Sequence, residues 1–510
     1  MLENNKIIKF CDICLVTLPD NWASGQLPYY YLYLAGYLEN KDYRVEILDL
    51  APYAKTFSKN KGLKNFYRFS AFDKDLYFAR IINNLKNINP RFVGLAAFTT
   101  DYFLAMELAA LVKKEIGCRI IMGNVHPSLF PDDCIYEGSP VDFVVIGEGE
   151  ATLAELLDQD RRGGDFSNIS GLYFWHDGQP VRTATRELID ISDLPLIPFK
   201  KVDMEYYLKP RQILIRNLVF SGVGLLTGRG CPYFCTFCAA NSIYKAQGVA
   251  KRVRHHSLDS VFLNIEVLVK KYKIDALYIM DDTFTVLPDR VLEFCERIKK
   301  LGIYWGAETR ANLINRKLLL AMKDSGCVQL DFGVESGSPE MLTMVKKAIT
   351  VDQTITAFKL CREFGIRTLA NILINLPGEE EKHIKETEDL LKIIKPTVIN
   401  VSILKPFPAT PIFDDFVKMT HVEYIRSLKN FLAGDRSIFR LCLHNLDLDK
   451  LNKDLRKYSY KTLKQTFKEL KISLGLILKS SQKLAYLFKY FRMLAVKVIL
   501  ILRRIKNLIF

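Results

Sequence analysis

The chain has 510 residues, of which 49% are hydrophobic, 25% charged and 12% aromatic. This balance excludes a disordered chain, a collagen and a coiled-coil fibre, and the length allows about three domains. The net charge is +15, but nine basic and no acidic residues lie between Lys471 and Phe510. The first 470 residues therefore hold 63 basic against 57 acidic side chains, a net charge of only +6. The excess charge belongs mostly to the tail, so a nucleic-acid partner for the body of the chain is not indicated.

The cysteine count and the chain ends bear on the cellular compartment. Eleven cysteines, an odd number in a long chain, argue against a disulfide scaffold and for a reducing environment. The first ten residues, MLENNKIIKF, lack the apolar core of a secretory signal. The tail is apolar, but no uncharged run reaches the roughly 18 residues that a membrane-spanning helix needs. We therefore expect a cytoplasmic protein.

Residues 1–160 alternate short apolar runs with helix-like stretches. Strands are expected at 7–18, 44–50, 91–99, 118–122 and 142–146, and helices at 28–39 and 102–115. This alternation predicts a Rossmann-like, doubly wound parallel sheet, in which ligands bind beyond the carboxyl ends of the strands. Those ends carry Thr17, Leu18, Gly123, Asn124, His126, Gly147, Glu148, Gly149 and Glu150.

The rest of the chain divides into three predicted parts. Residues 161–215 read as a linker with a hairpin at Asp177-Gly178. Residues 216–430 resume the alternation, with strands expected at 223–227, 276–280, 302–306, 328–333, 366–373 and 398–404. Six strands in this rhythm predict a (β/α)6 partial TIM barrel, whose sites lie on loops at the carboxyl ends of the strands. Residues 431–510 are expected to form a helical extension.

The strongest chemical signal is the segment GRGCPYFCTFCAAN, which follows the first predicted barrel strand. It places Cys231, Cys235 and Cys238 within eight residues of one loop. Three thiolates on one loop can converge on a soft metal centre and leave an open coordination position for substrate or cofactor. A chance cluster among eleven cysteines and a structural zinc site completed by His255 or His256 are the alternatives. Zinc sites usually pair cysteines at C-x-x-C spacing, which only Cys235 and Cys238 have here.

The C-x-x-x-C-x-x-C spacing, with the aromatic Phe237 before the last cysteine, resembles the cluster loop of the radical S-adenosylmethionine (SAM) superfamily. The resemblance implies a 4Fe–4S cluster on the three cysteines, with SAM bound to the fourth iron. Later segments resemble the strand ends that hold SAM in that superfamily: YIMDDTFT, WGAETR and DFGVESGS. Together with the cluster loop, they imply SAM contacts at Phe237, Asp281, Asp282, Arg310, Glu335 and Ser336. The alternatives that need no ligand are a helix cap at Asp281-Asp282, a salt-bridged Glu335 and a surface Arg310.

Two later motifs depart from the superfamily pattern. NILINLPGEE carries Asn375, and KPFPATPIFDDF carries Ala409, where glycine is usual. Because glycine permits conformations that other residues resist, both departures concern the loop backbone and not the cluster.

The N-terminal part resembles the cobalamin-binding domain that precedes many radical SAM barrels, through GNVHPS and VDFVVIGEGEATLAELL. The resemblance implies that cobalamin is bound by the strand-end residues given above. None of the seven histidines lies in the Asp-x-His-x-x-Gly pattern that ligates cobalt from below. His126 lies in a Gly-x-x-His-Pro turn instead, where a hydrogen-bonded loop histidine is the alternative to a cobalamin contact.

The resemblance implies a radical SAM enzyme that reductively cleaves SAM to a 5′-deoxyadenosyl radical, and in this subfamily a cobalamin-dependent methyltransferase acting on an unreactive carbon. An oxidative cyclase or another rearrangement enzyme is the first alternative, and a non-catalytic cobalamin or redox sensor is the second. The expected partners are a small-molecule or lipid-like substrate and a reducing protein such as flavodoxin or ferredoxin.

The basic tail has a helical pattern of apolar residues. These recur at spacings of three and four: Leu484, Leu487, Phe491, Leu494, Val498, Ile501, Ile505 and Leu508. The stripe fits a helix packed on the barrel, an interfacial helix on the inner face of an anionic membrane, or a dimerising coiled coil.

Overall fold

The computed structural model contains two compact units, each described by itself. The first comprises residues 1–203, 230–260 and 405–441, and the second comprises residues 204–229, 261–404 and 442–510. The structure describes residues 11–19, 25–57, 72–192, 194–212, 214–250, 253–420, 423–427, 446–460, 469–476, 485–487 and 490. Within these ranges no helix is both long and apolar enough to cross a membrane.

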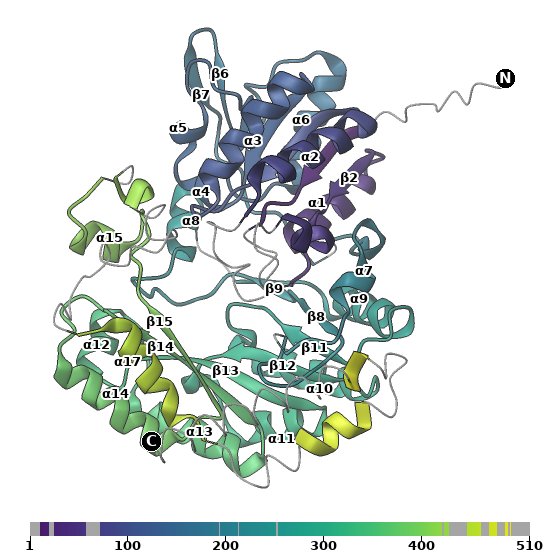
Figure 1. Ribbon diagram of the computed structural model, residues 1–510. Helices are drawn as coiled ribbons and strands as arrows, with labels where there is room; N and C mark the ends of the chain where they lie inside the picture. The colour runs from purple at the N-terminus through teal and green to yellow at the C-terminus, as the bar shows by residue number, and fades with distance from the viewer. Residues whose placement is uncertain are drawn as a thin grey trace. The chain divides into compact units, whose positions relative to one another are not determined.

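The first unit is built on a seven-stranded sheet in the order β2-β1-β3-β4-β5-β6-β7 (Figure 1). Its strands are β1 (Cys11–Val16), β2 (Val45–Leu48), β3 (Pro90–Ala96), β4 (Arg119–Gly123), β5 (Phe143–Val145), β6 (Leu172–His176) and β7 (Gln179–Arg182). The first five are parallel, and β6 and β7 join antiparallel. The strand order reverses between β1 and β3, the kind of position where open α/β sheets bind ligands.

Burial explains why the parallel strands form. All six residues of β1 are buried, as expected for a strand covered on both faces. The flanking helices are α1 (Tyr29–Glu39), α2 (Lys74–Ile88), α3 (Tyr102–Glu115) and α6 (Glu150–Arg162). The packing of α1 on α6 and of α2 on α3 fits a doubly wound sheet. Helix α2 was not anticipated, although Asp73 caps it by accepting a hydrogen bond from the Leu76 amide at 3.1 Å.

The hairpin between β6 and β7 follows directly from its turn residues. Asp177 and Gly178 have φ angles of 47° and 77°, the left-handed conformation at both central positions of a type I′ turn. The turn lets β6 and β7 pair, and β6 extends the sheet at the edge of β5.

The second unit contains a six-stranded parallel sheet whose strands follow each other in chain order. They are β8 (Gly222–Leu225), β11 (Ala276–Ile279), β12 (Tyr304–Thr309), β13 (Cys327–Glu335), β14 (Arg367–Ile374) and β15 (Val398–Ile403). Figure 1 shows the helices on one side of this sheet. They include α10 (Pro288–Lys299), α11 (Arg316–Asp324), α13 (Val351–Phe364) and α14 (Glu381–Ile394). The expected fold class, a Rossmann-like sheet followed by a partial barrel, is confirmed.

The two faces of the barrel sheet differ in chemistry. On the helix side, Trp305 packs edge-on against Phe284 and Phe294. On the other side, the Tyr278 hydroxyl donates to the Asp331 carboxylate at 2.8 Å, and Gln329 donates to the same carboxylate. The side of the sheet that carries Asp331 therefore includes buried polar groups, and hydrogen bonds between them offset the cost of their burial.

The described part of the tail packs on the second unit. Ile472, Leu476 and Tyr486 join a core cluster with residues 215, 218–220, 276, 278 and 328. The Tyr486 hydroxyl donates to Asp275 and accepts the Ser221 amide at 2.7 Å. Packing on the barrel, the first of the three alternatives for the tail, therefore holds at Tyr486. Of the predicted apolar stripe only Leu487 is described; its other residues lie outside the described ranges.

Candidate functional site

The cysteine loop carries three thiols that are not joined in disulfides. Cys231 and Cys238 are partly exposed, Cys235 is buried, and none of them forms a disulfide. A hydrogen bond from the Cys238 amide to the Cys235 carbonyl at 3.2 Å gives the loop a tight turn. Phe237 lies in the same turn and is partly buried. Within the described residues no three His, Cys, Asp or Glu side chains are gathered closely enough to hold a metal ion. The thiols are a soft donor set carried by one loop, which fits an iron–sulfur cluster better than it fits oxygen-preferring cations.

Of the two histidines in the zinc alternative, His256 packs against an aromatic ring. His256 is buried, and its ring stacks on that of Tyr33 with centroids 5.4 Å apart. A side chain held in this way is fixed by the aromatic packing of the N-terminal domain.

The carboxyl end of β4 carries a polar side chain, Asn124, that the described residues satisfy only in part. Asn124 has a φ of 81°, and its side-chain oxygen caps the short helix α4 (Val125–Leu129) by accepting the Val125 amide at 2.9 Å. Its Nδ2 atom is buried and has no hydrogen-bond partner among the described residues. An unsatisfied donor in a left-handed residue at a strand end is typical of a ligand site, because such strain and desolvation are otherwise costly. This residue therefore fits a large polar ligand such as cobalamin.

The other early strand ends are closed by protein contacts. The Thr17 hydroxyl donates to Asp49 at 3.1 Å, and Leu18 is buried. Gly123 is partly buried, with Val145 within 3.8 Å of the position where a side chain would begin. These residues shape the edge of the sheet without presenting a free polar atom of their own.

His126 is fully buried in an aromatic and polar cage. Its ring lies 4.2 Å from that of Tyr102 and 5.4 Å from that of Phe130, measured between centroids. Its Nδ1 lies 3.4 Å from the Thr99 hydroxyl, and its Nε2 lies 3.3 Å from the Asp133 carboxylate. Both ring nitrogens face protein groups, so the loop-histidine alternative describes this geometry.

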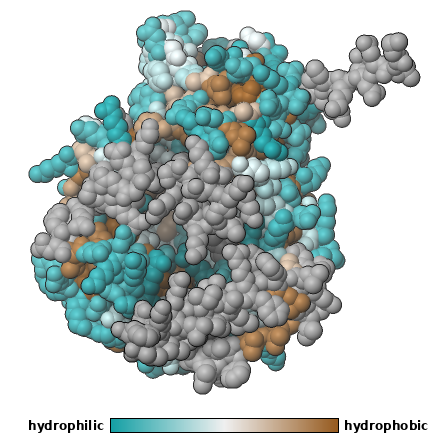
Figure 2. Space-filling view, viewed as in Figure 1, coloured by the Kyte–Doolittle hydropathy of each residue, from teal (hydrophilic) through white to brown (hydrophobic). Residues whose placement is uncertain are grey.

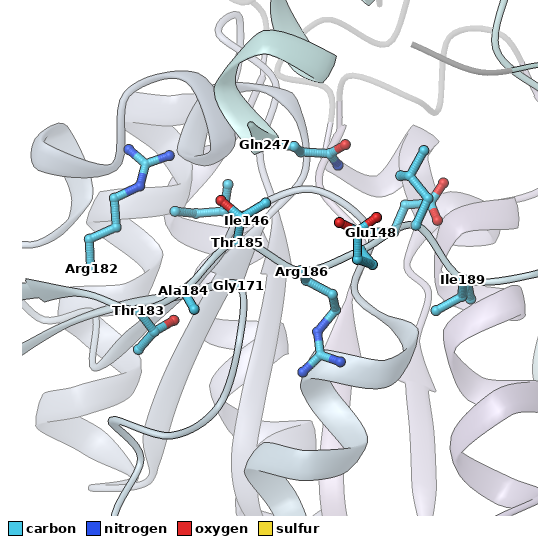
Figure 3. Close-up of a pocket in the computed structure, with 12 residues that line it drawn as sticks. Ile146, Glu148, Gly171, Arg182, Thr183, Ala184, Thr185, Arg186, Ile189 and Gln247 are labelled. Carbon is cyan, nitrogen blue, oxygen red and sulfur yellow. The ribbon is translucent and has the colours of Figure 1, made fainter. Parts of the chain in front are cut away.

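The Gly147–Glu150 loop also contacts the chain itself (Figure 3). Both carboxylate oxygens of Glu148 accept hydrogen bonds from the Arg254 guanidinium, and the distance from Nη1 to Oε2 is 3.1 Å. Gln247 lies against Gly147 so closely that a side chain there would collide with it. Gly149 precedes α6, whose first residue, Glu150, is buried.

In the second unit, Asp281 holds a turn. Its carboxylate accepts hydrogen bonds from the Thr227 amide at 2.6 Å, the Thr227 hydroxyl at 2.5 Å and the Gly228 amide at 3.1 Å. Burial raises the pKa of Asp281 to about 6 in spite of these bonds. Thr227 lies four positions before Cys231 in the sequence, so Asp281 fixes the backbone from which the cysteine loop starts. The neighbouring Asp282 is exposed.

Glu308 has a strongly shifted acidity. It is exposed, but protein surrounds it on most sides, and this desolvation is the main reason that its pKa rises to about 7. The negative charges of Asp331, Asp282 and Glu335 raise the pKa further, and Lys347 opposes them. A carboxyl poised near neutral pH is a candidate for proton transfer or for binding a cationic group.

Arg310, Glu335 and Ser336 are all buried around an unanticipated lysine. Lys347 pairs with Glu335 at 2.6 Å, and the backbone carbonyl of the same lysine accepts a hydrogen bond from Arg310. Glu335 has a φ of 64°, a strained conformation for a non-glycine residue and a common mark of a functional position. Ser336 lies 3.2 Å from the Thr387 hydroxyl. The salt-bridge alternative for Glu335 matches this geometry, whereas Arg310 is 4% exposed and is not a surface residue.

Both departures from the glycine pattern adopt the conformation that glycine favours. Asn375 has a φ of 71° and Ala409 a φ of 66°. The Glu379 carboxylate accepts the Asn375 amide at 2.6 Å and the Leu376 amide at 3.2 Å, and so stabilises the first of these turns. Asparagine tolerates this region better than alanine does, so the strain is concentrated at Ala409.

The sequence did not single out Lys347 or Arg254. Lys347 lies in the run KKAIT, and Arg254 lies in RVRHH; both look like ordinary basic surface segments. Only the fold shows that each of these side chains is enclosed and paired with a predicted site residue, Glu335 or Glu148.

Two family models match the chain in the expected places. The B12 binding domain model matches residues 28–157, and the radical SAM superfamily model matches residues 225–391. The first match covers most of the N-terminal sheet, and the second runs from the end of β8 into α14.

Three known proteins indicate the range of the relatives. A protein of Pyrococcus horikoshii named as an uncharacterized methyltransferase is 30% identical over 71% of this chain and 79% of its own length. The anaerobic magnesium-protoporphyrin IX monomethyl ester cyclase of Rubrivivax gelatinosus is 26% identical over 78% of this chain, which spans 66% of that relative. The solved structure of the radical SAM methyltransferase TsrM from Kitasatospora setae has the same fold, with a TM-score of 0.63, 20% identity, and coverage of 80% of this chain and 78% of TsrM. With both domains present and in this order, the chain belongs to the family of cobalamin-dependent radical SAM methyltransferases.

Proposed function

We propose that this protein methylates an unreactive carbon of its substrate, using SAM, a 4Fe–4S cluster and cobalamin. The observation that carries the proposal is the loop with Cys231, Cys235 and Cys238. In the same unit, the end of the sheet carries Asn124, whose Nδ2 is buried without an acceptor among the residues that the structure describes. One set of donors is soft and suits iron–sulfur chemistry, and the other suits a polar organic ligand.

The three cysteines are the proposed cluster ligands, and Phe237 of the same loop is a proposed SAM contact. When bound, the cluster supplies the electron that cleaves SAM, and cobalamin carries the methyl group. Each methylation consumes two molecules of SAM. One gives up its methyl group and leaves as S-adenosylhomocysteine. One electron cleaves the other to methionine and a 5′-deoxyadenosyl radical, which takes a hydrogen atom from the substrate and leaves as 5′-deoxyadenosine. A second electron from the reducing partner restores the methyl carrier for the next turnover.

The proposed SAM contacts separate into two roles. Asp282, Arg310, Glu335 and Ser336 are proposed to bind SAM directly, with the Arg310 guanidinium suited to a carboxylate. Asp281 is proposed to act through the turn at Thr227, because its own oxygens already accept three hydrogen bonds.

The proposed cobalamin contacts lie at the carboxyl edge of the N-terminal sheet. They are Thr17, Leu18, Gly123, Asn124, His126, Gly147, Glu148, Gly149 and Glu150, of which Asn124 offers the clearest free donor. The chain's part is to hold the ligand at this edge and to exclude water from it.

Product analysis tests the proposal. Full-length protein is reconstituted anaerobically with iron, sulfide and hydroxocobalamin and then given SAM and dithionite. We expect 5′-deoxyadenosine over many turnovers, and about one equivalent of S-adenosylhomocysteine per bound cobalamin in the absence of substrate. Cys238→Ala should abolish 5′-deoxyadenosine, and Cys118→Ala, in a cysteine outside the loop, should not. A protein that holds four irons per chain and makes no 5′-deoxyadenosine would refute the proposal.

Oxidative cyclisation is the alternative that the similarity to the Rubrivivax cyclase favours. The same assay separates the two reactions, because a cyclase forms 5′-deoxyadenosine without transferring a methyl group. Absence of S-adenosylhomocysteine from a protein with bound cobalamin would therefore favour the cyclase.

We further propose a one-electron protein donor of the flavodoxin or ferredoxin type, and a peripheral contact of the basic tail with anionic lipid. Leu470 and Leu474, on the described helix at 469–476, are 52% and 51% exposed. Figure 2 shows hydrophobic surface where Figure 1 draws this helix in yellow at the lower right. A chain ending at Tyr490 keeps the packed Tyr486 and removes five basic residues. It should sediment less than the full-length chain with phosphatidylglycerol vesicles, and equal sedimentation would end the membrane proposal.

A further inference from the structure

The helix that follows the cysteine loop lies on the carboxyl edge of the N-terminal sheet. Helix α8 (Ala240–Gln247) begins two residues after Cys238 and packs against α4, which follows β4. At the other end of α8, Arg182 donates to the Ala246 carbonyl at 2.7 Å. The loop and the edge proposed for cobalamin are therefore parts of one packed unit.

The Gly147–Glu148 turn makes the most specific of these contacts. Figure 3 shows Gln247 and Glu148 lining one pocket, with the guanidinium of Arg186 pointing away from Gln247. Gly147 has a φ of 81°, and a methyl group added there would come within 1.8 Å of the Gln247 amide nitrogen. Glycine is therefore favoured by the φ angle, and any side chain here would force Gln247 of α8 to move, whether or not a ligand also uses the turn.

An ion pair between Glu148 and Arg254 connects the same turn to the segment that follows α8. The side chains are only 19% and 13% exposed, and the Arg254 guanidinium also donates to the Ile189 carbonyl at 2.7 Å. A planar guanidinium that binds both carboxylate oxygens fixes orientation as well as distance. An exposed ion pair would have little effect, but an enclosed one leaves a desolvated charge when either partner is removed.

We infer that Glu148 and Arg254 form a positioning pair that holds the cysteine loop on the cobalamin edge of the N-terminal domain. The inference rests on the proposed function for the identity of the two ligands, but not for the contact. The Gly-Glu-Gly turn then has two roles, because it shapes the proposed cobalamin site and, through Arg254, orders the segment that follows the three cysteines. Because coupling between two sites is reciprocal, order at one edge should favour binding at the other.

Hydrogen exchange of the full-length chain tests the contact without any cofactor. Glu148→Ala and Arg254→Ala should each speed amide exchange in residues 240–257 by about tenfold or more, because a buried ion pair that loses one partner no longer holds the segment closed. The double variant should exchange no faster than the faster single variant, since both changes remove one interaction. Arg254→Lys keeps the charge but loses the bidentate guanidinium, so its exchange rate in this segment should lie between those of wild type and Arg254→Ala.

Glu155→Ala provides the matched control. Glu155 pairs with Arg186 in the same domain but is half exposed, so its loss should leave exchange in residues 240–257 unchanged. Gly147→Ala is an independent variant that should loosen the same segment by displacing Gln247. Unchanged exchange in the Glu148 and Arg254 variants, or additive effects in the double variant, would overturn the inference.

A second readout connects the pair to the cluster. After anaerobic reconstitution and gel filtration, the Glu148→Ala and Arg254→Ala proteins should retain less than about half of the iron that wild type and Glu155→Ala retain. If wild type itself holds no iron, the proposed function fails while the exchange result stands. If wild type holds iron and the variants hold as much, the positioning role fails while the proposed function stands.

Discussion

Replacing Asp281 by alanine and by asparagine separates the effect of its buried charge from the effect of the hydrogen bonds that it accepts. Both variants lack the charge whose burial raises the pKa of Asp281 to about 6. Asparagine keeps an oxygen that can accept the Thr227 and Gly228 amides, which lie 2.6 and 3.1 Å from one carboxylate oxygen. Alanine leaves both amides buried without an acceptor. At about 1–3 kcal/mol for each of the two orphaned donors, the alanine variant should be less stable than the asparagine variant by roughly 2–6 kcal/mol.

Thermal unfolding measures this difference at pH 7.5. A gap of about 3 kcal/mol corresponds to roughly 6–12 °C in Tm if the barrel unit unfolds as one. The alanine variant should also lose iron, because Thr227 begins the turn that leads to Cys231. Asp282→Asn, in the exposed neighbour, should leave Tm within about 1 °C of wild type. Equal Tm values for the alanine and asparagine variants of Asp281 would refute the account of this residue as the anchor of the turn.

The charge of Asp281 predicts a pH dependence as well. Its pKa rises from 3.8 to about 6 on folding, so the folded chain keeps a proton that the unfolded chain releases. The stabilisation from that proton is fully present below pH 3.8 and is lost as the pH rises through 6. Relative to Asp281→Asn, wild type should therefore lose about 1 kcal/mol between pH 5 and pH 7.5. A constant stability difference across this range would show that the carboxyl titrates normally.

Three other changes test separate parts of the fold. Ala409→Gly should raise the free energy of unfolding by about 0.5–1 kcal/mol, and Tm with it, because residue 409 has a φ of 66°. An unchanged Tm would mean that the left-handed turn is not strained. Glu308→Gln should stabilise the chain at pH 8 and not at pH 5, because the pKa of Glu308 is raised to about 7 and the uncharged amide mimics the protonated carboxyl. An equal gain in stability at both pH values would contradict the raised pKa. Tyr486→Phe should cost about 1–2 kcal/mol, since the Ser221 amide and Asp275 both lose a partner, and denaturant unfolding that matches wild type would show that the tail is not anchored there.

The strands could be predicted from sequence because burial on both faces imposes an unmistakable apolar pattern. β1, with all six residues buried, and the parallel strands of the second sheet were found within a few residues of their ends. Helix α2 was not anticipated, although its buried residues recur at helical spacing: Tyr77, Phe78, Ile81, Ile82 and Leu85. The hairpin was found because Asp177-Gly178 requires the left-handed conformation that its φ angles show.

The contacts of the site residues could not be predicted, because they depend on residues far away in the chain. Glu148 and Arg254 are 106 positions apart, and Asp281 and Thr227 are 54 apart. A motif identifies which residue is unusual, but the partner that makes it unusual is brought by the fold. For this reason Lys347 and Arg254 read as surface residues until the sheet and its loops are assembled.

The polar atoms of the predicted site divide according to what already satisfies them. The carboxylate of Asp281 is bound by backbone amides, and that of Glu148 is bound by an arginine. Such groups can shape a ligand site, but binding a ligand directly would break bonds that the chain has already made. The Nδ2 of Asn124 is different, because among the described residues it is buried without an acceptor. Asn124→Ala should therefore weaken binding of hydroxocobalamin, beside a loss of about 1 kcal/mol in stability from the missing cap of α4. Asp281→Ala should lower the stability further and leave that binding unchanged, and equilibrium dialysis beside thermal unfolding distinguishes the two. If Asn124→Ala destabilised the chain and bound cobalamin as wild type does, its unpaired nitrogen would belong to the scaffold and not to the site.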